Sequence, residues 1–247
     1  MEILYGIHPV AECFKARRRP VRRLWVSEPD RLKDLARSAG AEPKVKVEVV
    51  SREACQKLSG TGSHQGVVAE VGAYPYVDWQ DLLEPEPVPL VAILDNLTDP
   101  QNVGAILRSA LCAGATGVTL RSHHAALITA AVAKASAGAC EHLRVAQVSN
   151  QAMFLRAAGD AGLDRCALET DGDALWGADV DWRGPLALVI GAEGRGVGQL
   201  VGKLCDRRLR IPMRGDFDSL NASVAASLAL FEAARHRSGP TPGEETL

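Results

Sequence analysis

The stretch from residue 211 to 235, IPMRGDFDSLNASVAASLALFEAAR, constrains the fold more than any other part of the chain. A short apolar strand end leads through a polar, glycine-containing loop into a long helix, with Ser219 and Asn221 where the helix is expected to begin. Serine is a favoured N-cap, and the free backbone N–H groups of a first turn need acceptors. LVAILDNLTDPQNVGAILRSA and LALVIGAEGRGVGQL share this design. Because helix N-termini that follow strands often bind ligands, the three loops predict one composite pocket.

Changes in composition predict two modules and a tail. Residues 72–89 are rich in Pro and acidic residues and have no sustained period, which indicates a linker. We therefore expect a small α/β domain over residues 1–71 and a larger domain over residues 90–237. The polar segment 238–247 is expected to be disordered.

The larger module alternates strand and helix patterns, which predicts a parallel sheet with helices on both faces. In its last helix, apolar side chains recur at helical spacing. We expect this stripe to be the face that packs on the core, and its members are Leu220, Val224, Leu228 and Phe231.

Composition argues against several functional classes. The six cysteines form no C-x-x-C pair and are interpreted as buried thiols in a reducing compartment, without disulfides or zinc. His123 and His124 are adjacent, with no accompanying carboxylate cluster, so no metal is expected. The first residues lack the pattern of a signal peptide, and no apolar run is long enough to span a membrane. We expect a cytoplasmic protein without a membrane partner.

Charge points to nucleic acid only locally. The net charge is −2 and the isoelectric point about 6.3, so nucleic-acid binding would need a local basic patch. Residues 1–70 hold 13 Lys and Arg against 9 Asp and Glu, and ARRRPVRR (residues 16–23) concentrates this excess. This segment is either a solvated loop or a phosphate-contacting patch, since the planar fork of arginine suits phosphate oxygens.

The glycine-rich segment GAEGRGVG, residues 191–198, follows a predicted strand. It has neither the spacing of a dinucleotide fingerprint nor the Lys-Ser/Thr of a P-loop. Its glycines allow either a tight turn or close approach of the backbone to a ligand. Glu193 favours the second interpretation, because a carboxylate there could accept hydrogen bonds from a ribose, an amine or a substrate hydroxyl.

The segment DNLTDPQNVGAILRSA leaves two roles open for each of two residues. Asn102 is either a helix cap or part of a site. Arg108 lies in a mostly apolar helix, where a long cation usually extends to the surface. If Arg108 faces the pocket instead, it suits a phosphate or a polarised hydroxyl.

Three motifs, NVGAILRSA, LVIGAEGRGV and IPMRGDFDSLNASVAASLALFEAAR, resemble in order and spacing the signature motifs of the SpoU branch of the SPOUT RNA methyltransferases. YGIHPVAECFKA and GSHQGVVAEV resemble the ribosomal L30e-like substrate-binding domain of many members. The resemblance implies a parallel-sheet domain with a C-terminal trefoil knot, S-adenosyl-L-methionine as cofactor, and a homodimer. The order of modules is most similar to that of members that methylate a guanosine 2′-oxygen in the peptidyl-transferase P-loop of 23S rRNA.

The resemblance also implies roles for individual residues. Arg108 matches the catalytic arginine; its pKa above about 12 makes it a poor base, so we expect it to bind the adjacent phosphate or stabilise charge on the 2′-oxygen. The other polar motif positions are Asn102, Glu193, Ser219 and Asn221. Expected cofactor contacts are Gly191, Ile211, Met213, Leu220 and Asn221. Expected RNA contacts are Arg17, Arg18, Arg19, Arg22, His64 and Gln65.

Two alternatives stay open on the sequence. One is 2′-O-methylation of another rRNA or tRNA ribose, or action on adenosine, by the same fold. The other is a non-catalytic RNA-binding protein in which the L30e-like domain binds the RNA. Retention of Asn102, Arg108 and Asn221 argues against the second alternative.

Overall fold

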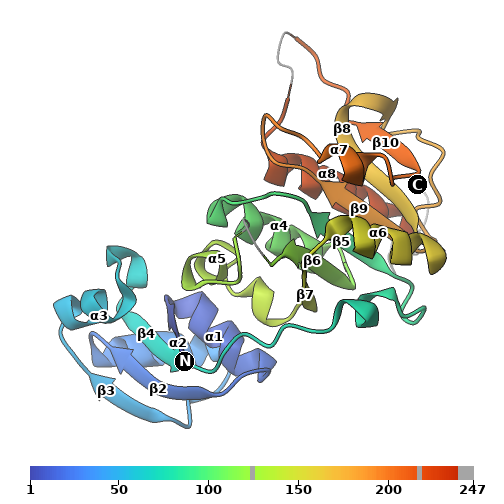
Figure 1. The fold of residues 1–247 in the computed structure, drawn as a ribbon. Helices are drawn as coiled ribbons and strands as arrows, with labels where there is room; N and C mark the ends of the chain where they lie inside the picture. Colours follow the sequence, from blue (N-terminus) through green and yellow to red (C-terminus); the bar gives the residue numbers. More distant parts are fainter. Residues whose placement is uncertain (123–125, 216–218, 239–247) are drawn as a thin grey trace, which may run out of the picture. The chain divides into compact units, whose positions relative to one another are not determined.

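The structure is a computed structural model that describes residues 1–122, 126–215 and 219–238 (Figure 1). His123, His124 and residues 239–247 of the predicted tail lie outside the described residues. Contacts divide the chain into two compact units. The first comprises Met1–Tyr76, Asp99–Arg108 and Ala126–Leu143, and the second Val77–Thr98, Ser109–Ala125 and Arg144–Leu247. The domain boundaries at residues 71, 89 and 237 stay a prediction.

A four-stranded sheet forms the first unit, in the order β1-β4-β2-β3. Its strands are β1 (Glu2–Tyr5), β2 (Val21–Val26), β3 (Lys46–Val49) and β4 (Val67–Val71). β2 and β3 are parallel, whereas β4 runs antiparallel to β1 and β2. The helices of this unit are α1 (Ile7–Ala16), α2 (Pro29–Ala39), α3 (Arg52–Ser59), α5 (Ala130–Ala135) and residues 100–108 of α4 (Pro100–Cys112), with 3₁₀ turns η1 (Gly62–His64) and η3 (Ala139–Glu141).

The second unit holds a six-stranded sheet in the order β10-β8-β9-β5-β6-β7. The strands are β5 (Leu90–Leu94), β6 (Gly117–Arg121), β7 (Val145–Val148), β8 (Asp164–Ala174), β9 (Leu186–Ile190) and β10 (Arg207–Arg210). All five strand pairs are parallel, which confirms the predicted α/β class. Its helices are η2 (Trp79–Leu83), part of α4 (Pro100–Cys112), α6 (Gln151–Asp160), α7 (Gln199–Gly202) and α8 (Ala222–Arg237). The trefoil knot stays a prediction.

β5 and β9 are continuous apolar runs, and every residue of both strands is buried. Strands that are buried on both faces have continuous apolar sequences, because helices cover a parallel sheet on each side. Within the described residues, no helix is both long and apolar enough to cross a membrane. Cys13, Cys55, Cys140 and Cys166 are buried free thiols. The prediction of a buried thiol is wrong for Cys112, which is exposed, and Cys205 is only half-buried.

The predicted core face of α8 is wrong. Val224 and Phe231 are 47% and 49% exposed, and Leu220, just before the helix, is 38% exposed. The buried face is made mainly of small residues at the same helical spacing: Ala222, Ala226, Ala229, Leu230 and Ala233. Small side chains let the helix backbone approach the sheet closely, so the larger apolar side chains are left on the outer face.

Part of the stretch interpreted as a linker is packed. In the second unit, Leu82 is 2% exposed and lies in a core cluster with Val91 and Ile93. In the first unit, the hydroxyl of Tyr74 donates to the carbonyl of Cys140 at 2.6 Å. Because the stretch is rich in Pro and acidic residues, its composition does not indicate that these two side chains pack against the domains.

The basic segment between α1 and β2 is largely structural. Arg19 is 5% exposed, and its guanidinium forms a fork with Glu141 at 2.5 and 3.0 Å and a further ion pair with Glu2 at 2.6 Å. Arg18 donates to the carbonyls of Leu143 and Pro75. The buried Arg19 is therefore unsuited to contact RNA directly. RNA contact by the half-buried Arg18 stays a prediction, and two of its donors are bound inside the first unit.

Replacing Arg19 should destabilise the protein strongly. In Arg19→Ala the buried Glu141 carboxylate loses its counter-ion, and an uncompensated buried charge costs about 3–5 kcal/mol. Urea unfolding should show a lower midpoint with an unchanged slope. Arg22→Ala on exposed β2 is the matched control and should stay within about 0.5 kcal/mol of the parent. Equal stability of the two variants would contradict the structural role of the ion pair.

Candidate functional site

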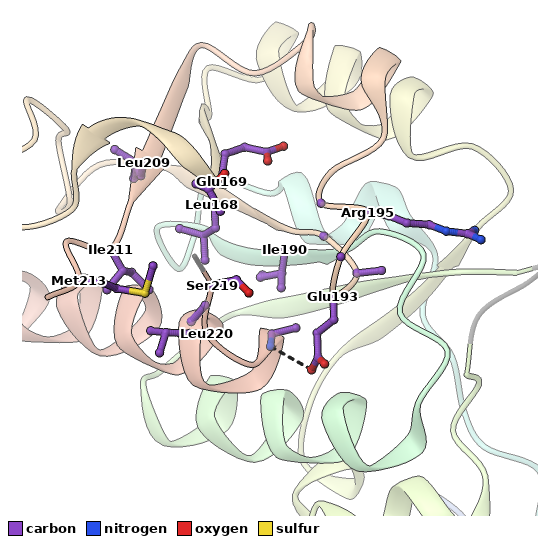
Figure 2. A pocket seen from close by; sticks show the side chains of 17 residues that line it. Leu168, Glu169, Ile190, Glu193, Arg195, Leu209, Ile211, Met213, Ser219 and Leu220 are labelled. Atoms are coloured by element: carbon purple, nitrogen blue, oxygen red, sulfur yellow. Dashed lines mark hydrogen bonds between the residues drawn. The ribbon is translucent and has the colours of Figure 1, made fainter. Parts of the chain in front are cut away.

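A cavity of about 720 Å³ lies at the carboxyl ends of β8, β9 and β10 in the second unit (Figure 2). Its size falls within the usual range for small-ligand sites, about 300–1,000 Å³. Its walls come from the middle of β8, where its pairing with β9 ends, the glycine-rich loop after β9, the segment after β10 and the start of α8. In open parallel sheets, ligands bind in this position, outside the carboxyl ends of the strands.

The lining combines a large apolar surface with two carboxylates. Figure 2 shows apolar side chains from β8, β9, β10 and the approach to α8 gathered on one side: Leu168, Ile190, Leu209, Ile211, Met213 and Leu220. Glu169 and Glu193 supply the negative charge, whereas Arg195 points away from the other side chains. Such a cavity suits a flat apolar group joined to polar or positively charged groups.

The loop after β9 is folded back on itself. The N–H of Gly196 donates to the carbonyl of Ala192 at 2.8 Å, and the two residues form an isolated bridge. A Cβ added at Gly191 would lie 2.1 Å from the carbonyl carbon of Gly196. Only glycine therefore fits at residue 191, because any side chain would overlap the returning backbone.

Glu193 joins this loop to the start of α8. Its carboxylate accepts from the Asn221 side-chain amide at 2.5 Å and from the N–H of Ala222 at 3.3 Å, the bond dashed in Figure 2. Asn221 is the N-cap, and its Oδ1 accepts from the N–H groups of Ser223 and Val224. A carboxylate at a helix N-terminus also interacts favourably with the helix dipole.

Two further carboxylates hold the far end of the loop. The buried Asp95, at the end of β5, accepts from the N–H of Gly198 at 2.8 Å. Glu169, on β8, accepts from the N–H of Val197 at 3.2 Å, and burial raises the pKa of its carboxyl. Because β5 and β8 flank β9, successive amides of one loop are bound from both neighbouring strands.

The structure brings together many of the residues predicted for the site. Those that line the cavity are Gly191, Glu193, Ile211, Met213, Ser219 and Leu220, and Asn221 joins them through Glu193. Asn102 and Arg108 are not among the lining residues. The N-cap role considered for Asn102 belongs to Asp99, whose carboxylate accepts from the N–H groups of Gln101 and Asn102. The chemical roles of all these residues stay predictions.

The residues predicted to contact RNA divide by exposure. Arg17 and Arg22 are exposed, as expected of phosphate contacts. His64 is 1% exposed, and its Nδ1 accepts from the N–H of Gly66, so the expectation of a direct RNA contact is wrong for this ring. Gln65 accepts from Lys134 at 2.5 Å and from the backbone of Ile7, so its oxygen is bound inside the first unit.

Sequence reasoning missed Asp95 and Glu169. Each is an acidic residue at or near the end of a predicted strand of the larger module, which is the signal that could have identified it. The order of the strands was not predictable from local pattern, so nothing showed that both would face the loop after β9.

Gly191→Ala should disrupt the loop. Because the new methyl group would meet backbone only 2.1 Å away, we expect a loss of about 1–3 kcal/mol in unfolding free energy, as for other overpacked sites. Gly202→Ala is the control, since its added Cβ meets only Val197 at 3.9 Å. Urea unfolding compares the two variants. If Gly191→Ala is as stable as Gly202→Ala, the loop does not have this closed conformation in solution.

Comparisons with known proteins agree with this geometry. The SpoU rRNA Methylase family model matches residues 89–231, and the model for RNA 2′-O ribose methyltransferase substrate binding matches residues 3–77. YacO of Bacillus subtilis, which carries a TrmH-family tRNA/rRNA methyltransferase name, is 38% identical over 96% of both chains. RlmB of Shewanella oneidensis, a 23S rRNA (guanosine-2′-O-)-methyltransferase, is 37% identical over 96% of this chain and 98% of its own.

A solved structure gives the same result for the fold. AviRb of Streptomyces viridochromogenes, a SpoU methyltransferase crystallised with AdoMet, superposes with a TM-score of 0.77 at 27% identity. The match covers 95% of this chain and 90% of AviRb. The extent of the family match, together with relatives similar over almost their whole length, shows that this chain belongs to the SpoU rRNA methylase family.

Proposed function

We propose that this protein transfers a methyl group from S-adenosyl-L-methionine to the ribose 2′-hydroxyl of a guanosine in the peptidyl-transferase P-loop of 23S rRNA. The observation that carries the proposal is the cavity at the carboxyl ends of β8, β9 and β10, lined by residues of two family motifs. The Shewanella oneidensis relative, similar over 98% of its length, supports the guanosine and the 23S rRNA.

The residues of the cavity fit this cofactor. Its apolar side suits adenine and the thioether region, and its two carboxylates suit a ligand that carries a sulfonium and an ammonium group. When bound, the cofactor supplies a methyl group already activated for transfer. The protein must therefore hold the 2′-oxygen in line with that methyl group and favour the loss of its proton.

Arg108 is our candidate for the second task. Its side chain is exposed on α4, and the next residue, Ser109, fixes the helix to α8 through a hydrogen bond between hydroxyls, 2.7 Å long, with Ser227. A guanidinium keeps its proton at neutral pH, so it would bind the neighbouring phosphate or stabilise negative charge on the 2′-oxygen. Asn102, Glu193, Ser219 and Asn221 would hold the ribose, the cofactor and the loops.

The first unit is our candidate for the RNA-binding part of the protein. The match of residues 3–77 to a substrate-binding family supports this role. Arg17 and Arg22 are exposed and can reach phosphates, which position an RNA without reading its sequence. Arg18 and Arg19 would act indirectly, by fixing the segment that carries these two residues.

We further propose a homodimer that uses α8. Val224 and Phe231, one face of this helix, leave about half of their surface exposed, and Leu228 is partly exposed beside them. An apolar stripe of this kind on a soluble domain commonly marks a protein interface. A second copy of the same helix presents a matching stripe, as a twofold interface requires.

A methyl-transfer assay tests the reaction. Unmodified 23S rRNA is incubated with the protein and radiolabelled S-adenosyl-L-methionine, and the labelled nucleotide is mapped by nuclease digestion. We expect label on a single guanosine 2′-oxygen in the P-loop. Label on another rRNA or tRNA ribose would contradict the target but not the chemistry. RNA binding without any label would favour a non-catalytic RNA-binding protein.

In the same assay, Arg108→Ala should lose at least a hundredfold in transfer rate, comparable to removal of one oxyanion-stabilising donor. Cofactor affinity by calorimetry should change little. Arg156→Ala, an exposed arginine on α6, is the matched control and should keep full activity. If the transfer rate of Arg108→Ala is close to that of the control, Arg108 does not take part in the reaction.

The homodimer is tested by light scattering after size exclusion. Phe231→Glu places a charge on the apolar stripe and should convert the dimer into a monomer that is still folded. Val49→Glu introduces the same change at an exposed residue of β3, outside the stripe, and should leave the dimer intact. A parent protein that is monomeric, or a Phe231→Glu dimer, would rule out this interface.

A further inference from the structure

Two carboxylates line the cavity, and their hydrogen-bond donors come from different elements. Glu193 is engaged by the start of α8, through Asn221 and Ala222. Glu169 accepts one hydrogen bond, from the N–H of Val197 to its Oε1 at 3.2 Å. Among the described residues, no hydrogen-bond donor reaches its Oε2. Glu169 therefore has an acceptor oxygen left for a ligand.

The glycine-rich loop leaves this oxygen uncovered. Oε2 of Glu169 lies 3.0 Å from the position that a Cβ of residue 196 would take, so any larger residue at Gly196 would press on the carboxylate. Gly196 has φ +61°, which also favours glycine. The loop thus donates one backbone N–H to Glu169 and provides no side chain to cover it, and Figure 2 places this carboxylate at the edge of the cavity beside the loop.

We propose that Glu169 accepts hydrogen bonds from the ribose hydroxyls of the bound cofactor and so selects a ribonucleoside. This inference rests on the proposed use of S-adenosyl-L-methionine. A carboxylate has lone pairs for both hydroxyls of a cis-diol, and hydrogen bonds to an ionised acceptor are about twice as strong as neutral ones.

The environment of Glu169 gives a second consequence. Burial raises the pKa of its carboxyl above the usual value of 4.5, which means that the ionised form is disfavoured in the protein without ligand. Hydroxyl donors stabilise the ionised form, so binding of a ribonucleoside lowers this pKa. As pH falls through the raised pKa, the carboxylate takes up a proton and the contribution of the diol to affinity is lost.

The test compares two ligands on four proteins by isothermal titration calorimetry. The ligands are S-adenosylhomocysteine and its 2′,3′-dideoxy analogue, neither of which carries a transferable methyl group. The proteins are the parent, Glu169→Ala, Glu169→Gln and the matched control Asp173→Ala, which removes an exposed carboxylate of the same strand that is not among the residues lining the cavity. Urea unfolding of each variant checks that it is folded.

We expect the parent and Asp173→Ala to bind S-adenosylhomocysteine at least tenfold more tightly than the dideoxy analogue. Glu169→Ala should lose most of this preference, with little change for the analogue. Glu169→Gln should keep part of it, because its amide oxygen can accept one hydroxyl. In the parent the preference should shrink as pH falls through the raised pKa of Glu169, and in Glu169→Gln it should not depend on pH.

Other outcomes would overturn the assignment. Equal weakening of both ligands by Glu169→Ala would show that the carboxylate only supports the loop through Val197. A preference for the diol that survives in Glu169→Ala would show that other groups bind the ribose hydroxyls and that Glu169 does not select the ribonucleoside. A parent protein that binds neither nucleoside would contradict the proposed cofactor itself, and the role of Glu169 with it.

Discussion

The loop that follows β9 depends on backbone hydrogen bonds that only its neighbours can supply. Its last amides, of Val197 and Gly198, point into the protein, where an unpaired N–H would cost about 1–3 kcal/mol. Glu169 and Asp95, from the two strands beside β9, accept them. Parallel strands place their carboxyl ends at one edge of the sheet, so acidic residues distant in sequence can meet the same loop.

The closed loop then determines the rest of the site. Once Gly191 is packed against Gly196, Glu193 lies at the start of α8 and binds its N-cap, Asn221. The second and third motifs are thereby joined by the Glu193 carboxylate, which accepts from Asn221 and from the N–H of Ala222. The apolar side of the cavity follows from this arrangement, because β8 and β10 bring their own apolar ends beside the same loop.

Neighbouring arginines in one basic segment have different roles, some in stability and some in the proposed binding of RNA. In the segment before β2, Arg19 neutralises the buried Glu141, and Arg18 binds carbonyl groups, while Arg17 and Arg22 face solvent. The four residues look alike in sequence, and their positive charge alone suggests phosphate binding. Burial separates them, since a buried guanidinium must have an acceptor for its N–H groups and an exposed one need not.

The sequence by itself determined the α/β class, the parallel sheet and the strand–loop–helix motifs, because these follow from local periodicity and the conformational needs of glycine and helix termini. It also placed Gly191, Glu193 and Leu220 in a common pocket. Strand order, and hence the partners of Asp95 and Glu169, required the tertiary structure. So did the face of α8 that is buried: periodicity identifies two faces, and packing distance against the sheet selected the alanine face over that of Phe231.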